Sequence, residues 1–482
     1  MITLPKFTQE NVLTLLCFDE TNCLLARNAV TKELFDHPYQ EVAEKAMDYI
    51  DRYKVPPKDH IADELEPYLN SAEGDQYKEL LKSIYKLNEN LNTQYVIDKL
   101  LEFIRGRKFE TALYDAAALQ LKGNIDEAEE VIHKAINFKL TLFDAGVKLT
   151  DLSFLAKNLE EENIYSTGIH ALDAAKVGPA NKQLYVFLGK KSCGKSWHVI
   201  QMSKVNILLN QKIAHITLEI SKELCQQRYI QNFLSFTKWQ MDMVKSPFFV
   251  RDNGKITRVD QKLVLNRPSL EDADVIDKIQ EQWAKFGPRL ENNLRIKEFF
   301  TGQLTMSHLR GYLDNLERTE NFIPDILIID QASHMKLNRS NKDDFRISLG
   351  GLYIDLRGLA VERNLAVVTN HHINRAGAMA KFTTGEHVSE DFSILATADT
   401  GIVYNQRPAE RKYKLARLWV DRGRSQKSGF MVLVAQNYDL GQFSLDSDIL
   451  PNSYNPDAGN AEEMFDGTNN SASGDVELIV DE

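Results

Sequence analysis

The sequence LYVFLGKKSCGKSWHV, residues 184–199, carries the strongest structural signal in the chain. Its first five residues are all apolar, as in a strand that is buried on both faces of a sheet. The residues that follow match the pattern GxxxxGK[ST]. A glycine-rich turn between a strand and a helix directs backbone N–H groups at phosphate oxygens, so the stretch predicts a nucleotide-binding P-loop. The residues of the predicted loop are Gly189, Lys190, Lys191, Ser192, Cys193, Gly194, Lys195 and Ser196.

Two side chains of this loop have distinct expected roles. Lys195 is expected to reach the β and γ oxygens of a nucleoside triphosphate, and the Ser196 hydroxyl is expected to bind Mg²⁺. The sequence therefore predicts ATP and Mg²⁺ as the ligands of the site.

Short apolar runs alternate with helical stretches around the loop, which is typical of an α/β fold with a mostly parallel sheet. Two later segments, residues 414–420 and 430–445, are predicted to extend the sheet as antiparallel strands. The predicted buried strands are residues 184–188, 213–218, 294–299, 326–329 and 365–369.

The N-terminal part of the chain lacks this alternation. Apolar residues recur there at helical spacing, for example in residues 39–50 and 77–85, and Gly and Pro are scarce. A plain helical bundle without chemistry is the simplest interpretation. The predicted regions are a helical N-terminal domain (1–140), a linker (141–164), the α/β domain (165–450) and a disordered acidic tail (451–482).

The net charge of −11 is unevenly distributed. Residues 451–482 hold eight acidic residues and no Lys or Arg, so the rest of the chain carries −11 + 8 = −3. A nearly neutral body can still present a local basic surface, so the total charge neither favours nor excludes a nucleic-acid partner.

Cysteine usage and hydropathy indicate where the protein works. The four cysteines show neither a CxxC pair nor zinc-ligand spacing with His, which fits reduced thiols. No apolar run is long enough to cross a membrane, and the N-terminus lacks the order of a signal peptide. We therefore expect a cytoplasmic protein with no membrane partner.

Hydrolysis of ATP also needs a group that holds the metal and one that orients water. Residues 324–330 form an apolar strand that ends in Asp330, which is expected to be an outer Mg²⁺ ligand. Glu219 ends the strand after the P-loop helix and is the candidate for activating water. The alternative for each is a surface carboxylate without function. Two carboxylates at sheet ends favour hydrolysis over nucleotide storage.

Several motifs taken together resemble DnaB-family replicative helicases, in particular those of large tailed bacteriophages, over residues 161–445. The resemblance implies a RecA-like P-loop NTPase core that forms a six-subunit ring with ATP between neighbours. Besides the P-loop, the motifs are YSTGIHALD (165–173), LE (218–219), NFIP (321–324), TNHHINR (369–375) and ATAD (396–399).

In that family an arginine of the adjacent subunit completes each ATP site. Residues 421–424, DRGR, match the segment that provides it. The resemblance assigns Arg424 as this arginine and Arg422 as a second contact to the γ-phosphate. Two solvated arginines at the end of a strand are the alternative.

The sequence departs from the family at two positions. Where the family has a Gln that senses the γ-phosphate and signals to the DNA-binding loops, this chain has His372. His can donate a hydrogen bond to phosphate, but its protonation would make the coupling sensitive to pH. Gln331, where an aromatic residue is common, is the second departure.

Two segments, residues 332–345 and 375–391, match the family loops that line the ring channel and hold single-stranded DNA. Six copies surround one strand, so few charges per subunit suffice. Ordinary surface loops are the alternative. The candidate DNA contacts are Lys336, Arg339, Lys342, Arg375 and Lys381.

The resemblance implies an ATP-dependent replicative DNA helicase, a homohexamer that moves 5′ to 3′ on single-stranded DNA and unwinds forked DNA. A separate primase is the implied partner, because the chain has no cysteine-rich zinc module. A helicase loader and a single-strand-binding protein are further candidates. Two alternatives are a RecA-type strand-exchange filament and a ring scaffold that binds ATP but hydrolyses little.

Overall fold

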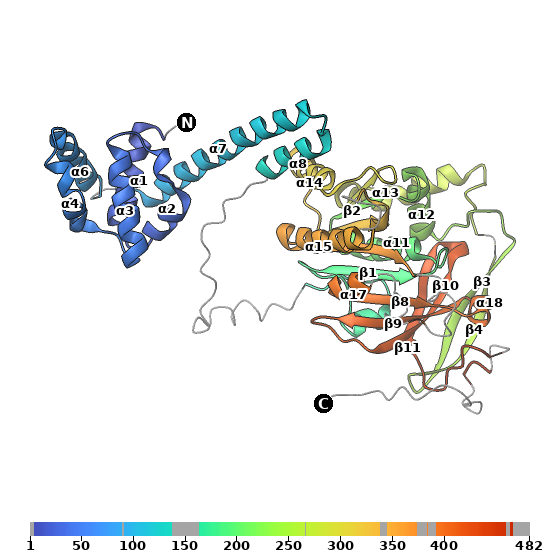
Figure 1. The fold of residues 1–482 in the computed structure, drawn as a ribbon. Helices are drawn as coiled ribbons and strands as arrows, with labels where there is room; N and C mark the ends of the chain where they lie inside the picture. Colours follow the sequence, from blue (N-terminus) through green and yellow to red (C-terminus); the bar gives the residue numbers. More distant parts are fainter. Residues whose placement is uncertain are drawn as a thin grey trace. The chain divides into compact units, whose positions relative to one another are not determined.

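The structure of the chain is a computed structural model, and it contains two compact units, Met1–Phe154 and Leu155–Glu482 (Figure 1). Among the helices it describes, none has the length and apolar composition needed to cross a lipid bilayer. The described residues are 4–88, 91–136, 163–265, 267–337, 345–373, 383, 392–458 and 463–465.

The N-terminal unit is helical throughout its described part. One apolar core runs through it, to which α3 contributes Val42, Ala46 and Ile50 at helical spacing. The long helix α7 is capped by Asn92, whose side chain accepts a hydrogen bond from the Tyr95 N–H, and its second half pairs with α8. Its elements are α1 (Lys6–Phe18), α2 (Cys23–Ala29), η1 (Lys32–Leu34), α3 (Tyr39–Tyr53), η2 (Lys58–His60), α4 (Ile61–Glu64), α5 (Glu66–Leu69), α6 (Gly74–Asn88), α7 (Thr93–Leu121) and α8 (Ile125–Ile136).

The second unit is built on a nine-stranded sheet with the order β11-β10-β9-β8-β1-β7-β6-β2-β5. The strands from β8 to β5 in this order are parallel, and β9, β10 and β11 are added antiparallel. The strands are β1 (Leu184–Gly189), β2 (Ile213–Thr217), β5 (Leu294–Glu298), β6 (Ile326–Asp330), β7 (Ala366–His372), β8 (Thr400–Asn405), β9 (Leu415–Gly423), β10 (Phe430–Asn437) and β11 (Gln442–Ile449).

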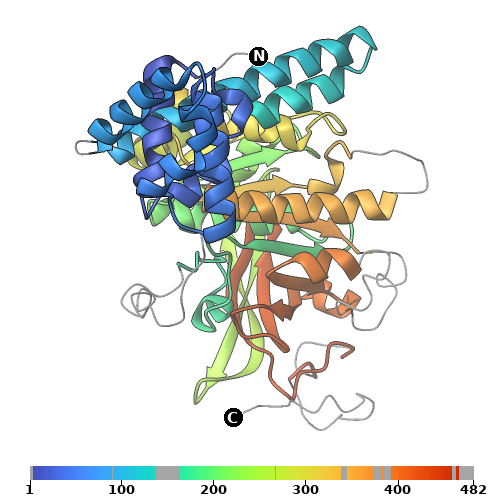
Figure 2. The same ribbon diagram turned by 60° about the vertical axis from the view of Figure 1, so that its left-hand side comes forward.

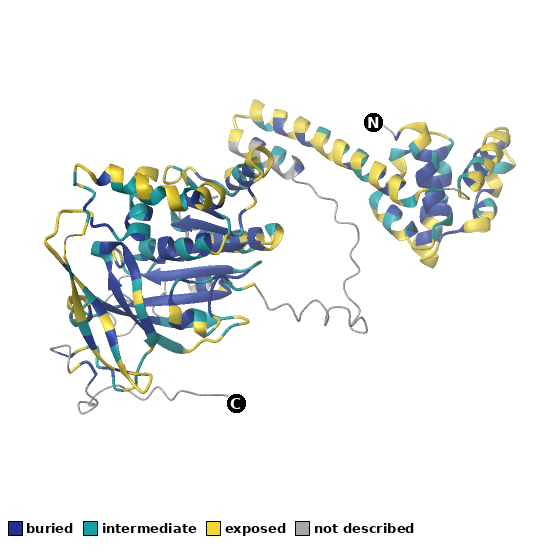
Figure 3. Cartoon of the chain, turned by 180° about the vertical axis from the view of Figure 1, so that it is seen from behind, coloured by how far each residue is buried: buried dark blue, intermediate teal, exposed yellow. Residues whose placement is uncertain are grey.

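Helices cover both faces of this sheet, so its central strands are buried (Figure 3). Alternate residues of β1 face opposite sides: Val186 packs with α14, α15 and α17, while Phe187 packs with α10 to α13. The remaining elements are α10 (His170–Ala174), α11 (Lys195–Leu208), α12 (Lys222–Leu234), α13 (Val275–Asn293), α14 (Met306–Glu320), η3 (Ala332–His334), α15 (Phe345–Arg363), α17 (Phe392–Thr397), α18 (Pro408–Lys412) and η6 (Tyr438–Leu440). The prediction of an α/β fold with a mostly parallel sheet, preceded by a helical region, is confirmed.

The structure adds two strand features that the sequence interpretation lacked. The fully buried strand β8 lies between β1 and the antiparallel end of the sheet. A two-stranded hairpin, β3 (Met243–Asp252) and β4 (Lys255–Leu265), follows α12 and packs on β10 and β11, as Figure 2 shows. The segment predicted as one strand at 430–445 is two strands, because η6 and Gly441, with a φ of 68°, turn the chain back on itself.

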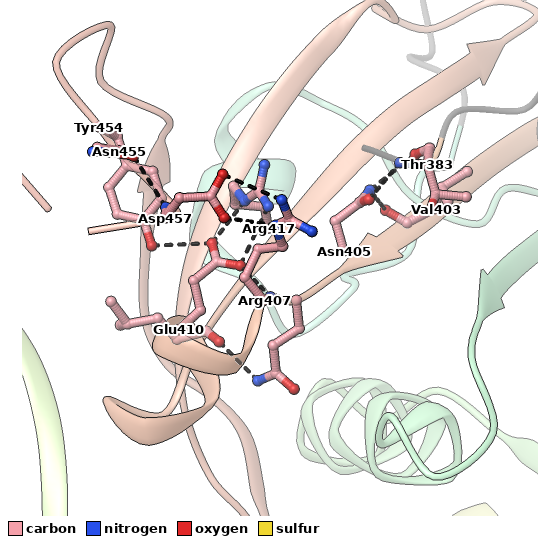
Figure 4. Close-up of polar contacts among 11 residues, drawn as sticks. Thr383, Val403, Asn405, Arg407, Glu410, Arg417, Tyr454, Asn455 and Asp457 are labelled. Atoms are coloured by element: carbon pink, nitrogen blue, oxygen red, sulfur yellow. Dashed lines mark hydrogen bonds and ion pairs between the residues drawn. The ribbon is translucent and has the colours of Figure 1, made fainter. Parts of the chain in front are cut away.

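The segment after Pro451 packs on the α/β domain in its described part, so any tail begins later than predicted. Tyr454, Ala458, Met464 and Phe465 join an apolar cluster with the hairpin and β10. The Tyr454 hydroxyl donates to Glu410 Oε1 over 3.0 Å, and Glu410 pairs with Arg417 over 2.7 Å (Figure 4). These apolar residues are interspersed among acidic ones, so the overall composition of residues 451–482 did not indicate that some of them pack on the domain. Residues 466–482 lie outside the described part.

Candidate functional site

The predicted P-loop connects the carboxyl end of β1 to the first turn of α11. Gly194 has a φ of 96°, and a Cβ atom there would lie 2.0 Å from the Tyr438 hydroxyl. A Cβ atom on Gly189 would lie 2.5 Å from the sulfur of Cys193. Both glycines of the motif are therefore required by close packing of the loop, and at Gly194 by backbone conformation as well.

Lys195 is buried, and its ammonium group is held at three points. Its Nζ donates to the carbonyl oxygens of Gly189 and Lys190 and to His372 Nδ1, over 3.2, 2.9 and 2.8 Å. Burial lowers the pKa of Lys195, and the nearby carboxylates of Glu219 and Asp330 oppose that shift. The two carboxylates therefore favour the charged form of Lys195 against the effect of burial.

His372 ends β7 beside the P-loop. Burial and the Lys195 ammonium lower the pKa of His372. Because an ammonium can only donate, the imidazole accepts at Nδ1, and its proton belongs on Nε2. The neutral ring thus keeps one N–H group available to a phosphate oxygen.

Asp330 ends β6 and is 2% exposed. Its Oδ1 accepts a hydrogen bond from Asn370 Nδ2 over 2.8 Å, and its backbone oxygen accepts one from the N–H of Leu218. The Asn370 amide oxygen is buried and has no partner in the described part of the chain. Asp330, this free amide oxygen and the Ser196 hydroxyl are oxygen donors of the kind that Mg²⁺ prefers, so these residues fit the ion.

A cavity of about 270 Å³ lies over the P-loop. Of the predicted site residues, Glu219 and His372 join the loop in its lining, whereas Asp330 is not among the lining residues but is close enough to influence the pKa of Lys195. The lining residues are Ser192, Gly194, Lys195, Ser196, Trp197, Glu219, Ile220, Arg228, His372 and Tyr438.

Three residues near this cavity were missed in the sequence. Arg228 projects from α12, and its guanidinium lies 5.4 Å from the centre of the Trp197 ring. Tyr438 belongs to a turn far along the chain, and Asn370 lies inside a strand where an amide is easily taken for structure. No short spacing marks Tyr438, whereas Asn370 lies two residues before the predicted site residue His372 and was within reach of sequence reasoning.

Arg422 and Arg424 lie away from the cavity of their own chain. Arg424 pairs with Asp399 over 3.2 Å, and Asp399 accepts a hydrogen bond from the N–H of Leu184. Arg422 donates to the carbonyl oxygen of Leu395 over 3.0 Å. Both arginines therefore sit at the amino end of β1, whereas the P-loop follows its carboxyl end.

One of the predicted DNA contacts can be located. Lys336 is exposed shortly after η3, at the carboxyl end of β6. Next to the second predicted loop, Asn405 holds the backbone of Thr383: the Thr383 N–H donates to Asn405 Oδ1 and Asn405 Nδ2 donates to the Thr383 carbonyl, over 2.7 and 3.0 Å (Figure 4). Outside the described residues lie Arg339, Lys342, Arg375 and Lys381.

The class of protein follows from this arrangement. A parallel sheet with a GxxxxGKS loop after β1, and with a buried carboxylate at the end of β6, two strands away, defines a P-loop NTPase fold. Over 226 residues, the sequence is 22% identical to the DnaB-like replicative helicase of Enterobacteria phage T4. That match covers 46% of this chain and only 42% of the phage T4 protein.

One solved structure shows the same fold. A DnaB-like replicative helicase, studied with its interactions with primase, aligns over 91% of this chain and 99% of its own, with a TM-score of 0.56 and 15% identity. A second solved structure, of an ATPase domain, aligns over 60% of this chain and 95% of its own, with a TM-score of 0.47 and 14% identity. No model of a known protein family matches the chain. The phage T4 match and the first structure confirm the resemblance to DnaB-like replicative helicases, including the RecA-like core.

Proposed function

We propose that the protein is an ATP-dependent replicative DNA helicase that works as a homohexameric ring, moves 5′ to 3′ on single-stranded DNA and unwinds the fork. The sequence similarity to a phage T4 helicase and the shared fold support this proposal. The direction of movement and the number of subunits follow from the family resemblance alone.

The position of the two arginines is the observation that best supports assembly into a ring. Arg424 lies beside Leu184, and the five residue steps from Leu184 to Gly189 span about 16 Å at roughly 3.3 Å per step. Neither arginine lines the cavity of its own chain. An arginine that completes an ATP site must then act on the site of another copy, as in a closed ring of identical subunits.

The chemistry proposed for the cavity is attack of water on the γ-phosphate. Glu219, exposed at the cavity wall, orients and deprotonates the water, and Lys195 and the loop N–H groups neutralise the phosphates. The N–H of His372 detects the γ-phosphate. Arg424 and Arg422 of a neighbouring copy stabilise the charge that develops during transfer.

Magnesium would be held by Ser196 and Asp330, with Asn370 bonded to the Asp330 carboxylate. A bound ion would supply positive charge that offsets the charge of the phosphates. Asn370 holds the Asp330 carboxylate in one orientation, which fixes where a metal ligand can point.

DNA contact is proposed for Lys336 together with Arg339, Lys342, Arg375 and Lys381. The solved helicase of similar fold was studied with its interactions with primase, and we extend a primase partner to this chain on that basis. A loader and a single-strand-binding protein complete the proposed set of partners.

Unwinding of a forked DNA with ATP and Mg²⁺, beside Glu219→Gln, tests the proposal. We expect the wild type to hydrolyse ATP and separate the strands, and the variant to bind ATP but do neither. Wild-type hydrolysis without strand separation, at high protein and low salt, would exclude the helicase. Open filaments in electron micrographs would then favour strand exchange, and closed rings without hydrolysis would favour a scaffold.

A further inference from the structure

The turn η6, between the last two strands of the sheet, packs directly on the P-loop. Its first residue, Tyr438, lines the cavity and donates its hydroxyl proton to the Cys193 carbonyl oxygen over 3.0 Å. Cys193 immediately precedes Gly194, at which any Cβ atom would collide with this hydroxyl. The tyrosine therefore contacts the loop at the residues that set the direction of its N–H groups.

The hydroxyl of Tyr438 is well placed to remain a donor. Burial raises the pKa of Tyr438 far above its usual range, so the group keeps its proton at any pH the protein meets. Tyr404, on β8, lies beside it and donates to Gln436 over 2.9 Å. The hydrogen bond to Cys193 is thus one of a partly buried set of polar contacts, in which a lost partner is costly.

The neighbouring residue, Asn437, fastens the same turn to the β3–β4 hairpin. Asn437 Nδ2 donates to the Ser246 hydroxyl over 2.6 Å and to the Lys245 carbonyl over 3.3 Å. Lys414 Nζ donates to the Lys245 carbonyl, to Asn437 Oδ1 and to the Asp439 carboxylate. The hairpin itself is anchored by Arg251, which pairs with Asp446 and Asp448 on β11.

We propose that Tyr438 is a positioning residue for the phosphate loop and that the β3–β4 hairpin holds it in place through Asn437. The inference rests on the proposed function only in taking nucleotide phosphate as the ligand of the loop. Tyr438 holds the loop through the Cys193 carbonyl, so it acts by keeping that carbonyl turned away and the N–H groups of the following residues free for phosphate.

This role predicts a specific pattern of effects. The loop N–H groups surround phosphates that ATP and ADP share. Loss of the hydrogen bond from Tyr438 to Cys193 should therefore weaken the binding of both nucleotides by the same factor. Uniform weakening raises KM and leaves kcat unchanged. A residue that acts on the γ-phosphate, such as His372, should instead change the preference for ATP over ADP.

The test is Tyr438→Phe in the full chain, with ADP affinity measured by calorimetry and ATP hydrolysis measured over a range of ATP concentrations. We expect roughly tenfold weaker ADP binding, equivalent to about 1.4 kcal/mol, a matching rise in KM, and kcat within about twofold of the wild type. Tyr454→Phe is the matched control, because it removes a buried tyrosine hydroxyl bonded to Glu410 instead of the loop.

Ser246→Ala tests the hairpin contact without touching the turn and serves if Tyr438→Phe fails to fold. It should also weaken ADP binding, but by a smaller factor of roughly two to three. Unchanged ADP affinity in Tyr438→Phe, or a fall in kcat with KM unchanged, would overturn the proposal, as would an equal loss in Tyr454→Phe. ADP binding needs neither hydrolysis nor DNA, so a failed unwinding experiment leaves this inference standing.

Discussion

Lys195 Nζ lies 2.8 Å from His372 Nδ1, which joins the phosphate loop to the end of β7. The ammonium donates and the ring accepts, so the contact exists only while His372 is neutral. A glutamine at this position could accept through its amide oxygen and donate through its nitrogen in the same way. At neutral pH the histidine can therefore make the hydrogen bonds that a glutamine would make here, and it differs from glutamine in acid.

This difference predicts a pH dependence for ATP hydrolysis stimulated by DNA. The pKa of His372 is lowered from 6.5, so the ring is neutral at pH 7 and gains a proton only as the pH falls below 6.5. The added charge would face the Lys195 ammonium and remove its acceptor. We expect the ratio of wild-type to His372→Gln activity to be constant near pH 7 to 8 and to fall about tenfold per unit below the midpoint.

Steady-state rates between pH 5 and 8 measure this ratio. Because the other groups of the site are present in both proteins, their contributions to the pH profile cancel in this ratio. A midpoint at or above 6.5, or superimposable profiles, would contradict the neutral hydrogen-bonded state of His372.

The separation of Arg424 from its own cavity predicts complementation between inactive subunits. Lys195→Ala lacks the phosphate contact and Arg424→Ala lacks the arginine, so each alone should lose most ATPase activity, by roughly 10³-fold or more for the arginine. When the two are mixed and exchanged, an intact site needs the loop of one variant and the arginine of the other. Random assembly gives a probability of 1/2 × 1/2, about one site in four.

Recovery of ATPase activity on mixing, absent from either protein alone, is the expected result. A mixture of Lys195→Ala with Glu219→Gln is the control, because both changes lie in one wall of the same cavity and cannot complement. If the first mixture stays as inactive as the second, the arginine does not act between copies.

The contact of Asn405 with Thr383 predicts that a variant of Asn405 has a defect confined to DNA binding. Its side chain makes two hydrogen bonds to the backbone of Thr383, within the segment that holds Arg375 and Lys381 in the sequence. Asn405→Ala removes both. We expect several-fold more single-stranded DNA to be needed for half-maximal ATPase stimulation, with the rate without DNA unchanged.

Gln406→Ala is the matched control for Asn405, because the adjacent side chain bonds the Leu415 carbonyl over 2.8 Å and not the predicted loop. Titrations of ATPase rate with oligonucleotide compare the two. Equal responses to DNA in both variants would show that the Thr383 contact has no part in DNA binding.

The parts of the fold that could be predicted are those whose signal is local. The loop at 189–196 and the apolar strand ending in Asp330 carry their chemistry in consecutive residues, and both lie as expected at carboxyl ends of parallel strands. The hairpin also had a local signal, since Asn253-Gly254 between two runs of strand-forming residues favours a tight turn, and both residues have positive φ.

The rest depends on contacts between distant segments. Tyr438 reaches Cys193 across 245 positions, and no pattern in either segment indicates the other. Strand β8 is short and contains Gly401, where a Cβ atom would lie 2.5 Å from Leu395, so its glycine weakens the strand signal for a reason visible only in the packed domain. Arg228 is one of several polar residues on α12, and only the fold shows that it faces Trp197.

The docked C-terminal segment predicts a step in stability between two truncations. A chain that ends at Phe465 keeps the cluster of Tyr454, Met464 and Phe465 with the hairpin, whereas one that ends at Pro451 loses it and leaves Glu410 without the Tyr454 hydroxyl. Burial of one large apolar side chain contributes about 1.5–3 kcal/mol, so the loss of these three should destabilise the shorter chain by several kcal/mol, up to roughly 9 as an upper estimate.

Urea unfolding followed by tryptophan fluorescence measures this difference for the second unit alone, because all four tryptophans lie in Leu155–Glu482. The chain ending at Phe465 should unfold at the same urea concentration as the full chain, since only residues 466–482 are removed. Equal midpoints for the two truncations would show that residues 452–465 add nothing to the domain. If both truncations lower the midpoint, stabilising contacts lie beyond Phe465 instead.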